Sequence, residues 1–279
     1  MVVYIDMNIE EAILGSSLVI AHRGARSLAP ENTLAAARKA FENGAQMWEI
    51  DVRVTRDGEL VLIHDATLQE TTDAAAVHPG RSPWPVHDFT LAELKELDFG
   101  GWFNERDPFG QIEAGNVSEA EQAAYRGEQV ATLERAIRFT LEHDRLINIE
   151  LKDLSGLPGH DCIADKVVGL VNSLEAIPKV LISSFNHDYL ARIKRLDKRI
   201  KTGALVANAH PDPVRLMHEL GTSTYHPALR AVRVRQFRRM KEKGFGILVW
   251  VVNNEKLALA LNKLGASGIF TDFPQMFAG

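Results

Sequence analysis

The feature that most constrains the fold is the alternation of short apolar runs with helical patterns along the whole chain. Nine runs rich in Val and Ile have the continuous hydrophobicity of strands that are buried on both faces. They span 17–22, 47–54, 60–64, 146–151, 180–184, 202–206, 223–227, 246–252 and 268–272. Helical patterns lie between most of them, at 32–44, 132–143, 161–174, 187–196, 213–220, 231–243 and 255–264. This alternation predicts an α/β protein with a parallel sheet, and the count favours a (β/α)8 barrel over an open doubly wound sheet.

The strand count exceeds the eight places of such a barrel by one. The runs 47–54 and 60–64 are joined by RDG with no helix between them, so one of the two is expected to depart from the regular pattern. If RDG forms a hairpin with Asp57 and Gly58 at its tip, Asp51 would lie opposite His64. If both runs are barrel strands, the two side chains lie near carboxyl ends. Either geometry brings Asp51 and His64 to the same rim.

Residues 66–131 interrupt the alternation of strands and helices with a long polar segment, in which only 90–97 (TLAELKEL) has a helical pattern. A structureless loop of that length is uncommon in a compact domain. We therefore predict an insertion between the third strand and the following helix, forming a small subdomain or a lid over the catalytic face. With 279 residues and 46% hydrophobic composition, the chain is otherwise expected to be a single domain, 1–279.

Charge and targeting signals exclude several classes of function. The net charge of −5 gives no reason to expect binding to nucleic acid, and no run of about 18 apolar residues predicts a transmembrane helix. The single cysteine, Cys162, rules out an intramolecular disulfide, and acidic residues stand where a secretory signal would carry basic ones. We expect a cytoplasmic protein with a small-molecule partner and no stable membrane insertion.

Three carboxylates lie near the ends of predicted barrel strands, where one face of the barrel is formed. Glu49 and Asp51 are two residues apart, as are Glu150 and Lys152, so each pair points to one side of its strand. Ionised carboxylates brought together in a low-dielectric site repel one another unless protons or a cation compensate them. Because the ligands are oxygens and no cysteine is involved, the pattern favours Mg²⁺, Ca²⁺ or Mn²⁺ over Zn²⁺.

Two histidines and two cations follow the same strand ends. A cation site beside Arg23 and Lys152 is suited to an anion with charge spread over several oxygens, which favours phosphate. His22 and His64 could then serve as general acid and general base. The alternatives are salt-bridged acids and hydrogen-bonded core histidines, but buried acids on such apolar strands are rarely without a function. The pattern therefore predicts hydrolysis of a phosphate ester.

Several motifs together resemble the glycerophosphodiester phosphodiesterase family. They are AHRGARSLAPENT (21–33), EIDVRVTRDGELVLIHD (49–65), IELK (149–152), ISSF (182–185), WVVN (250–253) and GIFTDFP (268–274). The resemblance runs from about residue 18 to 275 and implies a TIM barrel with a small insertion after the HD motif.

The resemblance also implies roles for individual residues. The implied metal ligands are Glu49, Asp51 and Glu150, and the implied acid and base pair is His22 and His64. Arg23 and Lys152 would hold the phosphate, while Phe185 and Trp250 would line the pocket for the alcohol. The expected products are sn-glycerol 3-phosphate and an alcohol.

Other functions fit the same site. A lysophospholipid substrate, as in related phospholipase D-type barrels, would need an apolar channel for the acyl chain, and a non-catalytic phosphate-binding barrel would show no turnover. The sequence leaves open which histidine is the acid, and whether water or the substrate's own hydroxyl attacks. We expect Glu31 to support the first helix, and Asn253, Thr271 and Asp272 to fix loops.

Overall fold

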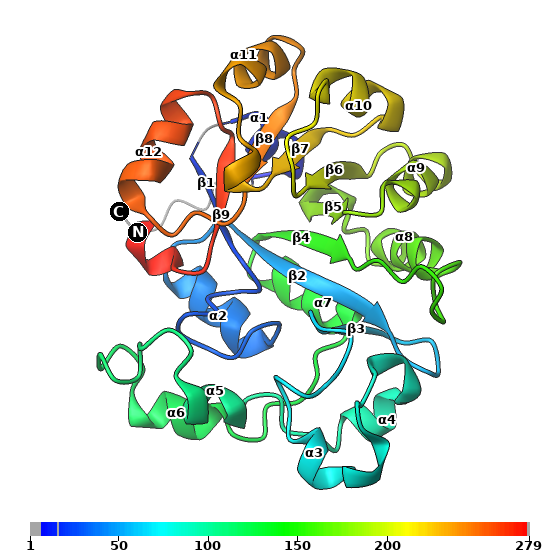
Figure 1. The fold of residues 1–279 in the computed structure, drawn as a ribbon, viewed down its shortest axis with the longest axis vertical. Helices are drawn as coiled ribbons and strands as arrows, with labels where there is room; N and C mark the ends of the chain where they lie inside the picture. Colours follow the sequence, from blue (N-terminus) through cyan, green and yellow to red (C-terminus); the bar gives the residue numbers. More distant parts are fainter. Residues whose placement is uncertain (1–6, 16, 278–279) are drawn as a thin grey trace.

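The computed structural model describes residues 7–15 and 17–277, in which eight parallel strands close into a barrel (Figure 1). The order around the sheet is β1-β9-β8-β7-β6-β5-β4-β2, and pairing of β1 with β2 closes it. The barrel strands are β1 (Leu18–Ala21), β2 (Met47–Val54), β4 (Leu146–Leu151), β5 (Val180–Ser184), β6 (Lys201–Val206), β7 (Thr224–Pro227), β8 (Gly246–Val249) and β9 (Gly268–Thr271). The predicted (β/α)8 barrel is confirmed.

Helices cover the outside of the barrel where the sequence predicts them. They are α2 (Leu34–Glu42), α7 (Leu133–Glu142), α8 (Ile163–Ser173), α9 (His187–Leu196), α10 (Pro213–Leu220), α11 (Val234–Glu242) and α12 (Glu255–Lys263). In α2 the Thr33 hydroxyl caps the first turn by accepting the Ala36 N–H, and the buried face includes Ala37 and Phe41. These apolar residues form the face of α2 that packs on the barrel core.

The amino end of the barrel is closed by a short helix, α1 (Ile9–Leu14). Ile9, Ala12 and Ile13 pack with residues from the starts of several strands, among them Leu18 and Met47. Burying these apolar side chains removes that end of the barrel from water. The carboxyl ends of the strands therefore form the face on which polar side chains can meet a ligand.

The extra strand, β3 (Leu60–Leu62), lies outside the barrel and pairs antiparallel with β2, so RDG does form a hairpin. The register differs by one residue from the expected one, because Ile63, and not His64, lies opposite Asp51 and donates its N–H to the Asp51 carbonyl. The reason is the turn: Thr55 pairs with Glu59 around three loop residues, the last of which, Gly58, has φ +86°. His64 nevertheless follows directly after the hairpin.

The insertion contains more helix than the sequence indicates, so the prediction that only 90–97 is helical is wrong. Its helices are α3 (Ala74–Val77), α4 (Leu91–Leu94), α5 (Gly101–Arg106) and α6 (Glu119–Tyr125), with 3₁₀ turns at Pro79–Arg81 and Val86–Asp88. Each has at most seven residues, too few for a helical period to stand out from polar sequence. Further 3₁₀ turns lie outside the insertion, at Ile177–Lys179, Leu229–Ala231 and Pro274–Phe277.

The insertion packs in two parts, with α3 and α4 beside β3, and α5 and α6 beside α2 (Figure 1). One part forms a small core with β3, in which Phe89 and Leu94 are fully buried. The other part joins the barrel core through Phe103 and Tyr125, and the Tyr125 hydroxyl donates to the Leu28 carbonyl. The second part therefore belongs to the main core.

Replacing Phe103 with alanine should destabilise the whole protein. The side chain is fully buried and lies edge-to-face on Tyr125 at 5.8 Å, and Phe→Ala changes in cores cost about 3–5 kcal/mol. We expect one thermal transition at a lower temperature, with Val77→Ala, a residue that is 40% exposed, unchanged within about 0.5 kcal/mol. A separate early transition confined to the insertion would contradict this packing.

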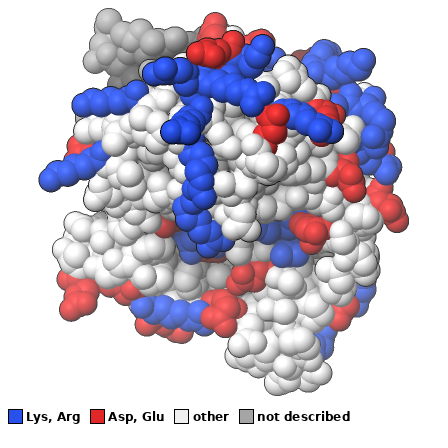
Figure 2. Space-filling view, turned by 45° about the horizontal axis from the view of Figure 1, so that its top comes forward, with Lys and Arg blue, Asp and Glu red and all other residues white. Residues whose placement is uncertain are grey.

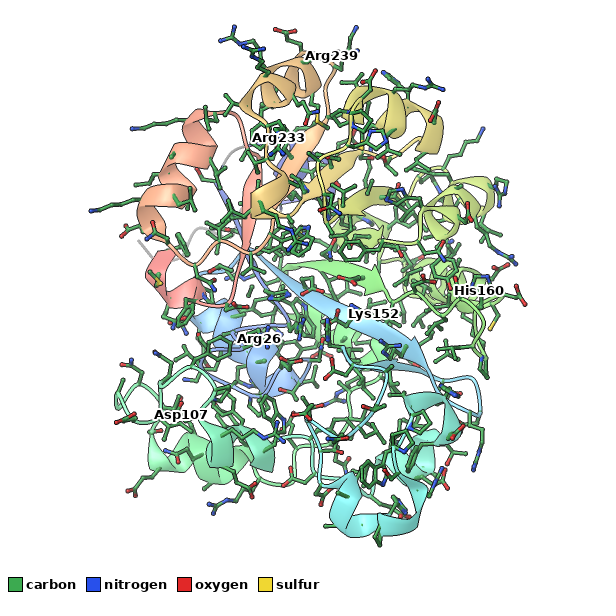
Figure 3. The ribbon with its side chains drawn as sticks, in the orientation of Figure 1. Arg26, Asp107, Lys152, His160, Arg233 and Arg239 are labelled. Carbon is green, nitrogen blue, oxygen red and sulfur yellow. The ribbon has the colours of Figure 1, made fainter. Side chains whose placement is uncertain are left out.

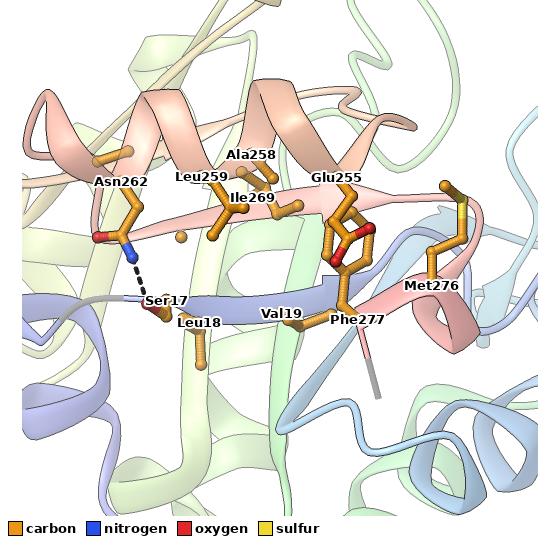
Figure 4. A pocket seen from close by; sticks show the side chains of 12 residues that line it. Ser17, Leu18, Val19, Glu255, Ala258, Leu259, Asn262, Ile269, Met276 and Phe277 are labelled. Atoms are coloured by element: carbon orange, nitrogen blue, oxygen red, sulfur yellow. Dashed lines mark hydrogen bonds between the residues drawn. The ribbon is translucent and has the colours of Figure 1, made fainter. Parts of the chain in front are cut away.

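A groove of about 270 Å³ lies on the outside of the barrel between α12 and β1 (Figure 4). Within the described residues, β9 is followed only by the turn Pro274–Phe277, so no long helix covers this part of the sheet. Leu259 and Met276 are exposed there, and none of the predicted site residues contributes to the groove. The predicted site residues lie elsewhere, at the carboxyl ends of the strands.

No helix in the described part of the chain is both long and apolar enough to span a membrane.

Candidate functional site

Glu49, Asp51 and Glu150 meet inside the barrel near the carboxyl ends of β2 and β4. The two strands pair in parallel with Asp51 beside Glu150, and the two-residue spacing puts Glu49 on the same side of β2 as Asp51. One oxygen from each carboxylate lies within 4.8 Å of the others. Glu49 and Asp51 are almost completely buried, so the predicted convergence of three acids is present.

Each acid has a different set of partners. Glu49 accepts the Arg23 backbone N–H on Oε2 at 2.8 Å, whereas its Oε1 is buried with no hydrogen-bond partner among the described residues. Asp51 accepts the Asn32 side-chain amide at 2.9 Å and the Lys152 ammonium at 3.2 Å. The same ammonium also donates to Glu150 at 2.7 Å.

The three acids differ in the direction in which their pKa values are shifted. Burial, followed by repulsion from Asp51 and Glu150, raises the pKa of Glu49 well above its usual value. Burial likewise raises the pKa of Glu150, with Asp51 adding to it. Burial also acts to raise the pKa of Asp51, but the cations of Lys152 and Arg23 outweigh it and hold that pKa below the usual value. One acid is thus firmly ionised and two resist ionisation.

These residues fit a hard divalent cation. Burial and repulsion from neighbouring carboxylates raise the pKa values of Glu49 and Glu150, and a cation between the two side chains would offset both effects. The unpartnered Oε1 of Glu49 supplies a free ligand atom, and an all-oxygen set with no sulfur is what Mg²⁺ and Ca²⁺ take. The acidic cluster can therefore hold a metal ion.

The two histidines are each fixed by a carboxylate. His22 Nδ1 lies 2.7 Å from Asp272 Oδ1, and His64 Nδ1 lies 2.7 Å from Asp65 Oδ1. Because a carboxylate only accepts, each Nδ1 carries a proton, and Nε2 is the ring nitrogen of each histidine that is left to take up or give a proton. The interpretation of Asp272 as a loop-fixing residue is incomplete, since it also orients His22; only closure of the barrel, which brings β9 beside β1, places it there.

Arg23 is held at the site by its backbone and by acids. Its φ of +56° turns the chain after β1, and its guanidinium pairs with Glu31 at 2.8 Å and with Asp51 at 3.3 Å. Glu31 also pairs with Arg26 at 2.6 Å. The N-cap of α2 is Thr33, and not Glu31. Glu31 instead pairs with both Arg23 and Arg26.

The side chains surround a cavity of about 130 Å³. It is lined by eight of the nine residues that the sequence predicts for the site: His22, Arg23, Glu49, His64, Glu150, Lys152, Phe185 and Trp250. Asp51 lies within the acidic cluster and does not line the cavity. Phe185 and Trp250 meet edge-to-face at 5.6 Å, and Phe185 is 43% exposed. They form an apolar part of the cavity lining.

The insertion does not contribute to the lining of this cavity. None of residues 66–131, all of which the structure describes, is among its lining residues, so a lid over the site stays a prediction. Figure 2 shows basic and acidic side chains close together around the hollow on the face that it displays, and Figure 3 places Lys152 near the centre of the barrel.

Comparison with known proteins identifies relatives over nearly the whole chain. The model of the glycerophosphoryl diester phosphodiesterase family matches residues 22–276. A glycerophosphodiester phosphodiesterase from Caldanaerobacter subterraneus subsp. tengcongensis is 32% identical over 259 residues, which cover 93% of this chain and 95% of that protein.

Solved structures agree with this assignment. A phosphodiesterase from Oleispira antarctica, solved in complex with its product sn-glycerol-3-phosphate, has a TM-score of 0.76 and 29% identity, with 94% of this chain and 95% of that chain covered. A putative glycerophosphoryl diester phosphodiesterase from Silicibacter pomeroyi has a TM-score of 0.80 at 24% identity, with 96% and 95% covered, and supports the fold. The chain belongs to the glycerophosphoryl diester phosphodiesterase family.

Proposed function

We propose that this protein is a glycerophosphodiester phosphodiesterase, a phosphoric diester hydrolase that releases sn-glycerol 3-phosphate and an alcohol. The observation that carries the proposal is a cluster of three carboxylates, two of them buried, beside a cavity of about 130 Å³ that is also lined by two carboxylate-bound histidines and two cations. The family match over residues 22–276 supports the same reaction class. The proposed substrates are small glycerophosphodiesters such as glycerophosphocholine, and the proposed location is the cytoplasm.

Glu49, Asp51 and Glu150 are the proposed ligands of one divalent cation, Mg²⁺ or Ca²⁺, with Mn²⁺ as a third candidate. When bound, such an ion would neutralise negative charge on the phosphoryl oxygens. Arg23 and Lys152 supply fixed positive charge beside it and would orient the diester. Phe185 and Trp250 would contact the alcohol and keep water from the far side of the phosphate.

We assign the base to His22 and the acid to His64. Burial holds the pKa of His22 below its usual value, which favours the neutral form that accepts a proton on Nε2. His64 is the more accessible of the two, with 32% of its side chain exposed against 16% for His22, and can exchange its proton with solvent after each turnover. Asp272 and Asp65 keep the two rings oriented.

The test of the proposal is release of sn-glycerol 3-phosphate. Purified protein with a divalent ion should convert glycerophosphocholine and glycerophosphoethanolamine to that product and the free alcohol. A lysophospholipid should compete poorly. No release from any glycerophosphodiester, with each of the three ions supplied in turn, would overturn the proposal.

The pH profile should show the state of His22. The charged groups facing it are Asp272, Arg23 and Arg26; burial and the two arginines lower its pKa from 6.5, and the hydrogen bond to Asp272 acts in the opposite direction. Activity that needs neutral His22 is present above this lowered pKa and is lost as the pH falls through it. We expect kcat/KM, measured over about pH 5–9, to be bell-shaped with its acid limb below 6.5.

Asp272→Asn should move that limb in a defined direction. The substitution removes the group that raises the pKa of His22, so the acid limb should move to lower pH while kcat falls. A limb that moves to higher pH, or a flat profile in the unsubstituted protein, would contradict the assignment of the base.

A further inference from the structure

The tip of the insertion touches the residues that hold His22, although it does not line the cavity. Phe109 lies in the loop after α5, and its ring meets Phe273 edge-to-face at 5.5 Å. The Arg26 guanidinium carbon lies 5.3 Å from the centre of the same ring. Phe109 is therefore a contact between the insertion and the loops that follow β1 and β9.

The loop that carries Phe109 is braced from within. Asp107 ends α5 with φ +38°, and its carboxylate accepts the N–H groups of Ile112 and Glu113 at 3.0 and 2.9 Å. The Gly110 N–H donates to the Asp107 carbonyl. These bonds close the loop on itself, so the ring at its tip has a defined place. In the view of Figure 3, Arg26 lies between Asp107 and Lys152.

Arg26 connects this contact to the site. One end of its guanidinium pairs with Glu31 at 2.6 Å, and the other lies 3.6 Å from Asp272 Oδ1. That same oxygen is the one bonded to His22 Nδ1 at 2.7 Å. The second oxygen of Asp272 accepts the Asn253 amide at 2.7 Å. Asp272 is thus held by groups from three directions.

We infer that the insertion positions His22 from outside the cavity: Phe109 holds Arg26, Arg26 and Asn253 hold Asp272, and Asp272 orients the imidazole. An aromatic face stabilises a guanidinium electrostatically and excludes water from one side of it. Without the ring, Arg26 would gain freedom to leave Asp272 for solvent. Phe109, Arg26 and Asp272 are positioning residues, because none of them lines the cavity that would hold the phosphate.

The test uses variants of Phe109 that distinguish the effect of its aromatic face from the effect of its apolar volume. Phe109→Leu keeps an apolar side chain without a ring face and should lower kcat by roughly 3- to 30-fold with KM changed less than about twofold. Phe109→Tyr keeps the ring and should restore kcat. Ile112→Ala, in the same loop but at a side chain that packs against the main core, should leave kcat unchanged.

A double-mutant cycle then tests whether Phe109 acts on His22 through Arg26. If Phe109 acts through Arg26, the double variant of Phe109→Leu with Arg26→Met should have the kcat of Arg26→Met alone, within about twofold. Independent, multiplicative losses would overturn the inference, as would an effect of Phe109→Leu on KM alone. Thermal melting of each variant accompanies the kinetics, and a loss of kcat that simply follows the melting temperature across variants would also overturn it.

The kinetic measurements rest on the proposed function, because they require turnover. A spectroscopic measurement that needs no turnover is therefore added. In ¹H–¹⁵N spectra of the imidazole groups, the Nδ1–H signal of His22 should shift or broaden in Phe109→Leu and in Arg26→Met, and should be unchanged in Ile112→Ala. An unchanged His22 signal in both positioning variants would overturn the inference. Absence of glycerol 3-phosphate release from the unsubstituted protein would overturn the proposed function alone, since the spectra do not depend on turnover.

Discussion

Replacing His64 with alanine should slow hydrolysis of glycerophosphocholine by roughly 10²–10⁴-fold, while hydrolysis of the p-nitrophenyl diester of glycerol 3-phosphate stays close to that of the unsubstituted protein. The choline oxygen is a poor leaving group that needs a proton as the ester bond breaks. The p-nitrophenolate ion leaves without one. His64 lies at the cavity with its Nδ1 bonded to Asp65, so its Nε2 is the atom that would deliver the proton.

His22→Ala is the matched comparison. A base that activates the nucleophile is needed whatever the leaving group, so this variant should lose a similar factor with both substrates. Comparing the rates of both variants on both diesters therefore identifies which histidine is the acid and which is the base. Equal losses with both substrates in His64→Ala would show that His64 is not the acid, and selective rescue of His22→Ala by the nitrophenyl ester would reverse the assignment.

Removing the divalent ion should have a comparable effect. A bound cation contributes several kcal/mol to stabilising charge in phosphoryl transfer, which corresponds to roughly 10²–10⁴-fold in rate. We expect EDTA to abolish release of glycerol 3-phosphate and added Mg²⁺, Ca²⁺ or Mn²⁺ to restore it. Glu49→Gln keeps the shape of the side chain but removes the charge, and it should show the same loss without recovery.

Thermal melting provides a readout that does not depend on activity. The ion should raise the melting temperature of the unsubstituted protein, because a ligand that binds only the folded state stabilises it, and should not raise that of Glu49→Gln. In the absence of metal, Glu49→Gln should be at least as stable as the parent, since burial and neighbouring acids raise the pKa of Glu49 and make its charge costly. Glu59→Gln, on the exposed hairpin turn, is the control. Full activity of the parent in EDTA would contradict the metal role.

Much of the site was predictable because strand periodicity places side chains without knowledge of the tertiary structure. The two-residue spacing of Glu49 and Asp51 is sufficient to put both on one side of β2, and parallel pairing puts Glu150 beside them. The hairpin register was not predictable to the residue. A two-residue type I′ loop would need a positive φ at both Asp57 and Gly58, whereas in the structure only Gly58 of the two has one; both loops are compatible with the sequence.

The insertion was the least predictable region. Its helices have four to seven residues, and two of them begin with capping boxes at Thr90 and Ser118. A single turn of helix is stable only when its tertiary contacts pay for nucleation. Packing of Phe103 and Tyr125 against the barrel provides those contacts, and no local pattern in the sequence reports them.

By itself, the sequence determined the strand and helix alternation, the barrel and the residues that its strand ends bring together, because these depend on local periodicity and on the common direction of parallel strands. Only the tertiary structure decided the partners of those residues. Asp272 reaches His22, 250 positions away in the chain, because β9 closes the barrel against β1. Phe109 reaches Arg26 because the insertion folds back onto the rim. Such contacts depend on how elements pack in space, which spacing along the chain does not encode.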